Sequence, residues 1–337
     1  MRYPVELALA GFHLRHKRAH GLLVRDFVGW LRVEFLGTAA ATGVLAALVE
    51  PRSTAELADD LGVSDHALLA SLLRVGESVG ELSITDGRWR LSGLRARAMV
   101  DPVVDGLAAL PEEAVLYGTD VYRRLGGRMA GDPPGDYLGM YGELVARVSQ
   151  VAEPILGPLI AEVVGACRPA RVLEVGCGSG VYLRQVADSS PSVSGAGLEV
   201  DPEVAGLARR NLARWSVDGR FAIHVGDVRN PPPALAGPWD LVLAMQNIYY
   251  FAGADRLDVL TRLRHLAPGG SVVIATAVAG TGDPAAAHLD VVLRSTAGNT
   301  GLPTVHELRA DLDAAGFSTI DERRLAPFQP LRAVVAS

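Results

Sequence analysis

The chain has 337 residues, of which 49% are hydrophobic and 21% are charged, and its formal net charge is −6. This composition is that of a folded globular protein and excludes a disordered chain. The negative net charge argues against nucleic acid or an anionic membrane as a partner, because both attract a positive protein surface. Two cysteines, Cys167 and Cys177, are too few for a disulfide framework or a zinc site, so we expect no bound metal.

The first ten residues contain Arg2, Pro4 and Glu6, so they lack the apolar core of a cleavable leader peptide. Charges, glycines or prolines interrupt the longest apolar runs, and we expect no segment that could span a bilayer. Together these features predict a soluble, cytoplasmic protein.

The N-terminal segment shows the pattern of a small helical domain. Apolar residues recur at helical spacing from about Val5 to Leu48. Ser53 is then expected to cap a helix through Leu61, and Ser64 to cap a second helix through about Val79. Two short strands, Glu81–Ile84 and Trp89–Leu91, follow with a turn at Asp86–Gly87. This order of elements predicts a winged helix.

Charge argues against the DNA-binding use of that winged helix. Between Thr54 and Gly80 the sequence has five acidic residues and one arginine. The second helix, where a recognition helix would lie, therefore offers little that could contact phosphates. A winged-helix regulator that senses a ligand stays an alternative, but a less favoured one.

The segment from Asp101 to about Pro169 is predicted to connect two domains. Gly126–Gly135 is rich in glycine and proline and predicts a loop, and a helical pattern resumes from Tyr137 to Val164. Tyr137, Tyr141 and Arg147 on that helix are candidates for lining a substrate pocket.

From Arg171 onward strands and helices alternate, which predicts an α/β domain with a mostly parallel sheet covered on both faces. The expected strands are 171–175, 193–200, 221–225, 240–245 and 271–276, with a closing antiparallel pair at 319–325 and 331–336. The expected helices are 180–188, 202–215, 255–266, 284–294 and 304–315.

The most specific pattern begins at the first of these strands. Val172–Gly180 reads VLEVGCGSG, and a second acid, Glu199, follows twenty-five residues after Glu174. A strand, a glycine turn, a helix and a second strand ending in an acid form a nucleoside-binding unit. A nicotinamide-binding turn would read G-x-G-x-x-G, but Val181 stands where its last glycine belongs. The spacing therefore disfavours a nicotinamide dehydrogenase.

The form E-x-G-x-G-x-G resembles motif I of the class I S-adenosylmethionine (SAM) methyltransferases, and Glu199, three residues before Pro202, is similar to that family's second acid. The resemblance implies SAM as cofactor, S-adenosylhomocysteine as product, and a Rossmann-like sheet of seven strands with the last one antiparallel. Small-molecule O-methyltransferases of this family have a similar N-terminal winged helix that pairs two subunits, which implies a homodimer. The domains expected on this basis are 1–100 (helical, winged helix), 101–165 (helical linker) and 166–337 (catalytic).

The resemblance also assigns cofactor-binding roles. It places Glu174 at the methionine ammonium, Glu199 at the ribose hydroxyls and Asp227 at the adenine amine. The competing acid Asp201 is better suited to cap the helix that begins at Pro202. The residues expected at the cofactor are Glu174, Gly176, Cys177, Gly178, Gly180, Glu199, Val200, Gly226, Asp227, Val228, Gln246 and Asn247.

The fourth strand ends in a segment that departs from the family pattern. Trp239–Phe251 reads WDLVLAMQNIYYF, whereas the winged-helix O-methyltransferases carry a catalytic His-Asp pair at this strand end. The remaining candidates for proton handling are Tyr249, Tyr250, His288 and His306, and Phe251 is a further candidate for the substrate pocket. Without the histidine, transfer to carbon, nitrogen or an already acidic acceptor is favoured, because such transfer needs mainly alignment.

The sequence thus predicts a SAM-dependent methyltransferase acting on a small molecule, in secondary metabolism. One alternative keeps SAM but attacks its methionine chain, by aminocarboxypropyl transfer or ring closure, and releases methylthioadenosine. The acceptor and the atom that is methylated are left open.

Overall fold

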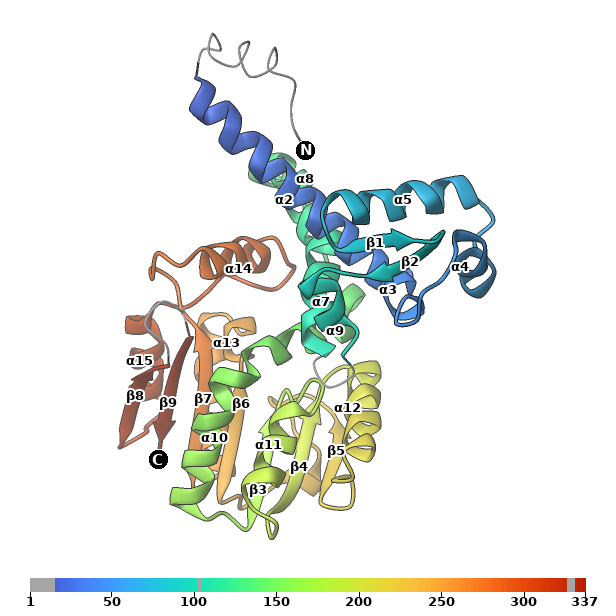
Figure 1. Ribbon diagram of the computed structural model, residues 1–337. Coiled ribbons are helices and arrows are strands. Elements are labelled where there is room, and N and C mark those ends of the chain that lie inside the picture. Colours follow the sequence, from blue (N-terminus) through green and yellow to red (C-terminus); the bar gives the residue numbers. More distant parts are fainter. Residues whose placement is uncertain (1–15, 102–104, 326–330) are drawn as a thin grey trace. The chain divides into compact units, whose positions relative to one another are not determined.

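The structure is a computed structural model that describes residues 16–101, 105–325 and 331–337 (Figure 1). The chain divides into two compact units, Met1–Leu116 and Tyr117–Ser337. The expected start of the first helix at Val5 lies outside the described residues, and the predicted domain limits at 100 and 165 stay a prediction.

The N-terminal unit is mostly helical, with one hairpin. Its core is formed by side chains such as Phe35, Leu57 and Leu73, each 1% exposed or less. Its helices are α2 (Lys17–Ala41), α3 (Val44–Ala47), α4 (Thr54–Leu61), α5 (His66–Ser78), α6 (Leu94–Met99) and α7 (Asp105–Glu113), and its strands are β1 (Leu82–Thr85) and β2 (Arg88–Leu91).

The two central helices of this unit begin at capping residues. At α4 the Ser53 hydroxyl accepts a hydrogen bond from the Glu56 N–H, and the Glu56 carboxylate accepts one from the Ser53 N–H. At α5 the prediction of Ser64 as cap was wrong: the Asp65 carboxylate accepts from the Leu68 N–H at 2.9 Å. The helix dipole stabilises a negative charge at the N-terminus of α5, which explains why Asp65 rather than Ser64 is the cap.

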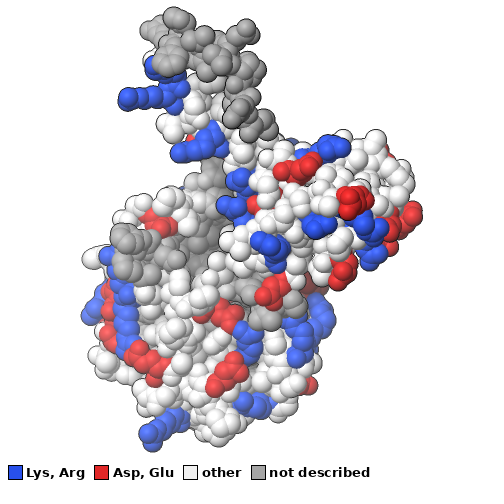
Figure 2. Space-filling model, in the orientation of Figure 1, with Lys and Arg blue, Asp and Glu red and all other residues white. Residues whose placement is uncertain are grey.

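The hairpin that follows α5 is tightly connected. Asp86 and Gly87 both have positive φ, 51° and 73°, which is the geometry of a type I′ turn. Trp89 on β2 is 2% exposed, and its indole N–H donates to the Thr54 hydroxyl at 3.0 Å. The predicted order of helix, turn, helix and hairpin is therefore present. On the face drawn in Figure 2, acidic and basic side chains are interspersed over this unit.

The C-terminal unit contains a seven-stranded sheet. The strands lie in the order β5-β4-β3-β6-β7-β9-β8, and β9 is antiparallel to both of its neighbours. The fold class predicted from the alternating pattern is thereby confirmed. The strands are β3 (Arg171–Val175), β4 (Ser194–Glu199), β5 (Phe221–Val225), β6 (Leu241–Met245), β7 (Ser271–Ala277), β8 (Ile320–Arg324) and β9 (Leu331–Ala336).

Helices cover both faces of this sheet (Figure 1). One apolar core contains side chains of α10, α11 and α12, and the opposite core contains side chains of α13 and α15. The helices of this unit are α8 (Thr119–Met129), α9 (Tyr137–Val148), α10 (Glu153–Cys167), α11 (Val181–Ser189), α12 (Pro202–Arg214), α13 (Gly253–Leu266), α14 (Pro284–Arg294) and α15 (Val305–Ala314).

Alternation along the strands decides which face each side chain takes. On β3, Val172 packs in the core under α10–α12, whereas Leu173 and Val175 pack in the core under α13 and α15. By the same period of two, Glu174 points toward the α10–α12 face. On β4, Leu198 takes the opposite face, so Glu199 points the same way as Glu174.

The helical region before the sheet is not one continuous helix. Tyr141 has non-helical angles (φ −131°, ψ 26°) inside α9, and a 3₁₀ turn at Ser149–Ala152 separates α9 from α10. By length and composition Tyr137–Cys167 could nevertheless cross a membrane, contrary to our expectation that no segment would. In this fold Leu156, Ile160 and Val164 of α10 are buried in the core of the sheet, so α10 is an apolar core helix.

Candidate functional site

The sequence-predicted cofactor residues lie at one edge of the sheet. Strands β3, β4, β5 and β6 run parallel, so the segments after Val175, Glu199, Val225 and Met245 all leave the sheet at the same edge. This carboxyl edge is where open α/β sheets bind ligands. The structure therefore brings together residues from four separate segments of the sequence.

The glycine turn after β3 uses backbone angles that favour glycine. Gly176, Gly178 and Gly180 have φ of 61°, 52° and 79°. A Cβ on Gly176 would come within 2.5 Å of the Asn247 amide nitrogen, so Asn247 packs directly on the turn. Between the glycines, the Cys177 side chain is 3% exposed and points toward Gly197 in the sheet. Cys177 therefore contributes its backbone to the turn, and its thiol belongs to the core.

Glu174 is a buried carboxyl without an ion-pair partner among the described residues. It is fully buried, and neither carboxylate oxygen makes a hydrogen bond of ordinary geometry within the described residues. Burial, and secondly the charge of Glu199, raise the pKa of Glu174 well above its usual range, and the Leu183 N–H opposes this only weakly. A buried acid of this kind is costly unless a cationic ligand group meets it.

Glu199, at the end of β4, connects this strand to the glycine turn by hydrogen bonds. One of its carboxylate oxygens accepts from the Gly178 N–H at 2.9 Å, and the other accepts from the N–H groups of Val200 and Asp201 at 2.9 and 3.2 Å. Asp201 instead caps α12 by accepting from the Glu203 N–H at 2.7 Å, as its position before Pro202 indicates. The Val200 side chain is 65% exposed, so only its backbone serves this arrangement.

The segment after β5 presents Asp227 in an ion pair. Both Asp227 oxygens accept from the Arg229 guanidinium, at 2.6 to 3.1 Å, and Arg229 lowers the pKa of Asp227. The Gly226 N–H donates to the Glu199 carbonyl at 2.9 Å, and Val228 is buried in the core under α13. An adenine amine would thus have to share the Asp227 carboxylate with Arg229.

The end of β6 is held in a strained conformation. Gln246 has φ of 56°, unusual for a residue with a side chain, and its amide donates to the Tyr182 hydroxyl at 2.8 Å and to the Ser149 carbonyl at 3.1 Å. The Asn247 amide donates to the Val175 carbonyl at the start of the glycine turn. Such strain is typical of functional sites. Tyr182 was missed in the sequence, although its place directly after the glycine turn was a usable signal.

The aromatic residues after Gln246 do not share one environment. Tyr249 and Tyr250 contact each other edge to face, with ring centroids 4.8 Å apart, and Tyr249 is 7% exposed. Burial raises the pKa of Tyr249 well above its usual range, which argues against a Tyr249 phenolate as a base. Phe251 is partly buried against the core under α13, and its place in the pocket stays a prediction.

His288 on α14 has a partner from α8. Its Nδ1 lies 3.1 Å from the Tyr122 hydroxyl, and the two rings stack with centroids 5.6 Å apart. Burial lowers the pKa of His288, which keeps the imidazole neutral near pH 7. A neutral imidazole is the form that can accept a proton. Tyr122 lies 166 residues away in the sequence, and no local pattern pointed to it.

Tyr137 and Tyr141 belong to an aromatic row with Tyr117. Tyr117 stacks on both, with ring centroids 5.7 and 5.5 Å apart. Tyr137 is 5% exposed, donates to Asp120 at 3.0 Å and accepts from Arg128 at 2.6 Å, so its hydroxyl is committed to a polar network. Arg147, also on α9, is partly buried. Tyr137 and Tyr141 thus both contact Tyr117, and their role in a substrate pocket stays a prediction.

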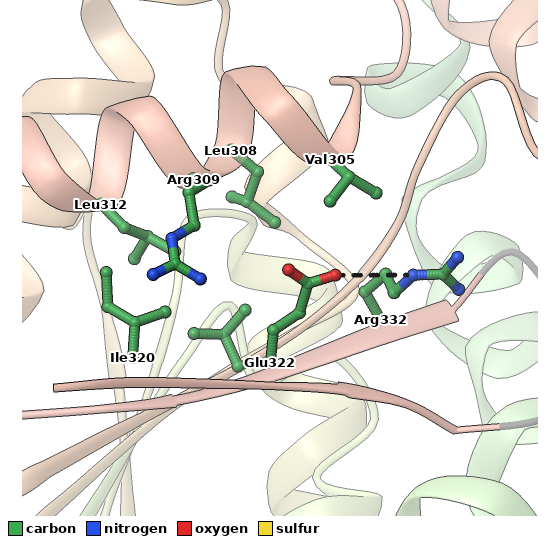
Figure 3. A pocket seen from close by; sticks show the side chains of 8 residues that line it. Val305, Leu308, Arg309, Leu312, Ile320, Glu322 and Arg332 are labelled. Carbon is green, nitrogen blue, oxygen red and sulfur yellow. Dashed lines mark ion pairs between the residues drawn. The ribbon is translucent and has the colours of Figure 1, made fainter.

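The small cavity drawn in Figure 3 lies elsewhere, between α15 and strands β8 and β9. Leucines and other apolar side chains line most of it, with the Arg332–Glu322 pair at 3.8 Å on one side. Its volume is about 10 Å³, room for no more than one water. It belongs to the opposite end of the sheet from β4 and β5 and plays no part in the candidate site.

Comparison with known proteins bears on this site. Residues 172–270 match a family model described as a methyltransferase domain. Malonyl-[acyl-carrier protein] O-methyltransferase of Geobacter sulfurreducens is 30% identical over 187 residues, which cover 54% of this chain and 67% of that protein. The chain belongs to the SAM-dependent methyltransferases. The family and the cofactor predicted from the glycine turn are thereby confirmed.

The structural likeness of this methyltransferase extends over nearly the whole chain. The mitomycin 7-O-methyltransferase MmcR has a TM-score of 0.74 at 22% identity, with 95% of this chain and 98% of that one covered. The N,N-8-amino-8-demethyl-D-riboflavin dimethyltransferase RosA of Streptomyces davawensis has a TM-score of 0.64 at 23% identity, covering 96% and 99%. These likenesses show the fold. The chain spans 38% to 67% of the length of four curated relatives that it matches.

The residues of the methyltransferase fit its family's cofactor. SAM presents an ammonium and a sulfonium, both cationic, and a ribose diol. The Glu174 carboxyl, which has no ion-pair partner within the described residues, can ionise when a cationic group meets it, and the three glycines of the turn leave its backbone open to a ligand. The Glu199 oxygen that accepts from the Gly178 N–H has accepting capacity left, whereas the other already accepts from two backbone N–H groups.

Proposed function

We propose that this protein transfers the methyl group of SAM to a small-molecule acceptor of secondary metabolism. The observation that carries the proposal is Glu174, a fully buried carboxyl at the carboxyl edge of the sheet whose oxygens make no hydrogen bond of ordinary geometry within the described residues. Such an acid is destabilising in the ligand-free protein, so its presence is explained by a cationic ligand group. Bound SAM would supply an electrophilic methyl group.

The other edge residues then divide the binding task. Glu199 would accept the ribose hydroxyls while holding Gly178 in place, and Asp227 would meet the adenine amine in competition with Arg229. Gln246 and Asn247 fix the end of β6 against Ser149 and the glycine turn. Rigid positioning of this kind is the main requirement for a direct displacement.

For proton handling the arrangement favours His288 over the two tyrosines. His288 is neutral near pH 7 and is oriented by Tyr122, whereas the buried Tyr249 resists ionisation. An acceptor that is already acidic, or a nitrogen or carbon acceptor, needs no such base. The similar structures include an O- and an N-methyltransferase, so the fold does not choose the atom.

The decisive experiment has two parts. Calorimetry with SAM and with NAD tests the cofactor, and saturable binding of SAM alone is expected. Incubation with SAM and an extract of the producing strain then identifies the modified metabolite and the nucleoside that is left. S-adenosylhomocysteine together with a product larger by one CH₂ supports the proposal. Release of methylthioadenosine would overturn it in favour of attack on the methionine chain.

The buried Glu174 gives a prediction about pH. A carboxyl whose pKa is raised on folding holds its proton more firmly in the folded state, so the free energy of unfolding falls as pH rises from about 4.3 toward the raised value. Glu174→Gln removes this loss. We expect the variant to be more stable than the wild type at pH 8, by on the order of 2 kcal/mol, and to bind SAM more weakly.

Urea unfolding at pH 5 and pH 8, with calorimetry of SAM binding, measures both effects. The stability gain should shrink at pH 5. Glu143→Gln, which alters an exposed acid paired with Arg210 at 3.5 Å, is the matched control and should move neither quantity much. A Glu174→Gln protein that is less stable than the wild type at pH 8 would contradict this account of the site.

We also propose that the protein is a homodimer that pairs through its N-terminal unit. The first half of α2 presents large apolar side chains to solvent: Leu22, Leu23, Phe27 and Trp30 are each 50% exposed or more. Phe27 and Trp30 contact each other, with ring centroids 5.4 Å apart, so the exposed surface is continuous there. Apolar surface of this kind marks an interface.

Sedimentation measures the oligomeric state. Leu23→Asp should convert the dimer to a monomer, whereas Arg25→Asp on the same helix should leave it dimeric. A wild-type protein that stays monomeric at micromolar concentration would contradict the proposal. We also propose that the protein lies in the cytoplasm, as a soluble enzyme of the methyltransferase fold.

A further inference from the structure

A groove outside the cofactor site is lined by arginines. It has a volume of about 480 Å³ and lies between the second half of α8 and the loop that follows it. Arg123, Arg124 and Arg128 come from α8, and Asp132 and Pro133–Gly135 from the loop. Volumes of this size are typical of small-ligand sites.

The charge of this groove is opposite to that of the whole chain. Arg123 and Arg124 share one carboxylate, Asp120, at 2.5 and 2.9 Å, and a second acid, Asp132, lies in the groove itself. Arg128 donates to neutral oxygens, the Ser295 carbonyl and the Tyr137 hydroxyl. Three guanidinium groups therefore face two carboxylates, in a protein whose net charge is −6.

The walls of the groove are fixed in advance. The Asp132 N–H donates to the Gly127 carbonyl at 3.0 Å, and Gly135 exchanges hydrogen bonds with Ser295 and Ala297 at 2.9 and 2.8 Å. Pro133 and Pro134 between these anchors have restricted backbones. Binding of a ligand would therefore cost little conformational entropy, because the loop is already ordered.

The guanidinium groups keep donors for a ligand. Each has five N–H donors, and the bonds to Asp120 use only part of them. The side chains of Arg123 and Arg124 are 70% and 62% exposed, so they can turn toward a bound group. Hydrogen bonds from Arg123 and Arg124 lower the pKa of Asp120 to about 2. This carboxylate therefore stays ionised and holds the two arginines in place.

We propose that this groove binds a phosphate group. A phosphate carries close to two negative charges near pH 7.5 and offers several oxygens to forked guanidinium donors. A carboxylate ligand carries only one negative charge. It would therefore gain less from the three arginines, while Asp132 would still repel it. Behind the groove, Tyr137 bonds to Arg128 and stacks on Tyr117, so a phosphate ester could continue toward this aromatic row.

Calorimetry with the full chain at low ionic strength tests this binding. The probes are inorganic phosphate, phenyl phosphate and benzoate. We expect both phosphates to bind saturably and benzoate to bind more weakly. R123A/R124A should weaken phosphate binding at least about tenfold, as expected when charge-assisted hydrogen bonds are lost. SAM binding should stay unchanged, which separates this test from that of the proposed function.

The matched control is R210A/R309A, which removes the same charge from two exposed arginines on α12 and α15. It should weaken phosphate binding less than about twofold, because distant surface charges are screened. If R123A/R124A does not fold, Arg123→Glu replaces it, with Arg210→Glu as control. Tighter binding of phenyl phosphate than of inorganic phosphate would identify an ester as the ligand, and equal binding a free phosphate ion. The proposal is overturned if phosphate does not saturate, or if both double variants lose binding equally.

Discussion

Replacing Glu199 by alanine should reduce the affinity for SAM about a hundredfold. The carboxylate is 8% exposed and accepts from three backbone N–H groups, one of them on Gly178 of the glycine turn. The variant would lose both the proposed ribose contact and the bond that fixes the turn. Two charge-assisted hydrogen bonds are worth about 3 kcal/mol, or roughly two factors of ten in the dissociation constant.

Asp201→Ala is the informative comparison, because Asp201 is the neighbouring acid on the same loop. Asp201 caps α12, so this variant should lose about 1 kcal/mol of stability and keep its SAM affinity within about threefold. Calorimetry and thermal unfolding of both variants measure the two effects. If Asp201→Ala weakens SAM binding more than Glu199→Ala does, the register of the site is displaced by two residues.

The cofactor edge could be predicted from the sequence because each of its parts is local. A strand, a glycine turn and an acid at the next strand end are read within about thirty residues, and parallel strands bring their carboxyl ends to one edge. The period of two fixes the face of each acid within its own strand, and the pairing of Glu174 with Gly197 in the observed register then places Glu199 on the face of Glu174. Several helix limits differ from prediction by one to three residues, as at α13, which begins at Gly253. The loop predicted at Gly126–Gly135 was wrong in its first four residues, because α8 continues to Met129.

The acceptor side could not be predicted in the same way. Its contacts join segments that are far apart in the sequence, such as Tyr122 with His288 and Arg128 with Ser295. No periodicity encodes pairs of this kind. Phe251 is partly buried against the core under α13, and its predicted place in the pocket stays a prediction.

In the N-terminal unit, Glu81→Ala should lower the free energy of unfolding by about 1–3 kcal/mol, because it leaves the buried Ala96 N–H without its acceptor. Glu81 is 1% exposed and lies 3.1 Å from Arg95 and 3.5 Å from Arg32. Its second oxygen accepts from the Ala96 N–H at 3.2 Å, in the first turn of α6. The N-cap of α6, Gly93, has no side chain to do this, and a Cβ there would lie 1.9 Å from the Glu81 carboxylate. One side chain thus caps α6 and neutralises two arginines.

Urea unfolding compares Glu81→Ala with Glu77→Ala, an acid four residues earlier that is 38% exposed and paired with Arg74. The control should change stability by less than about 0.5 kcal/mol, since exposed pairs contribute little. Glu81→Gln should fall between the two, because an amide can still accept from Ala96 but leaves Arg32 and Arg95 without a counter-charge. The ordering matters more than the size of any one effect. If Glu81→Gln were as stable as the wild type, capping of α6 alone would explain why this acid is buried.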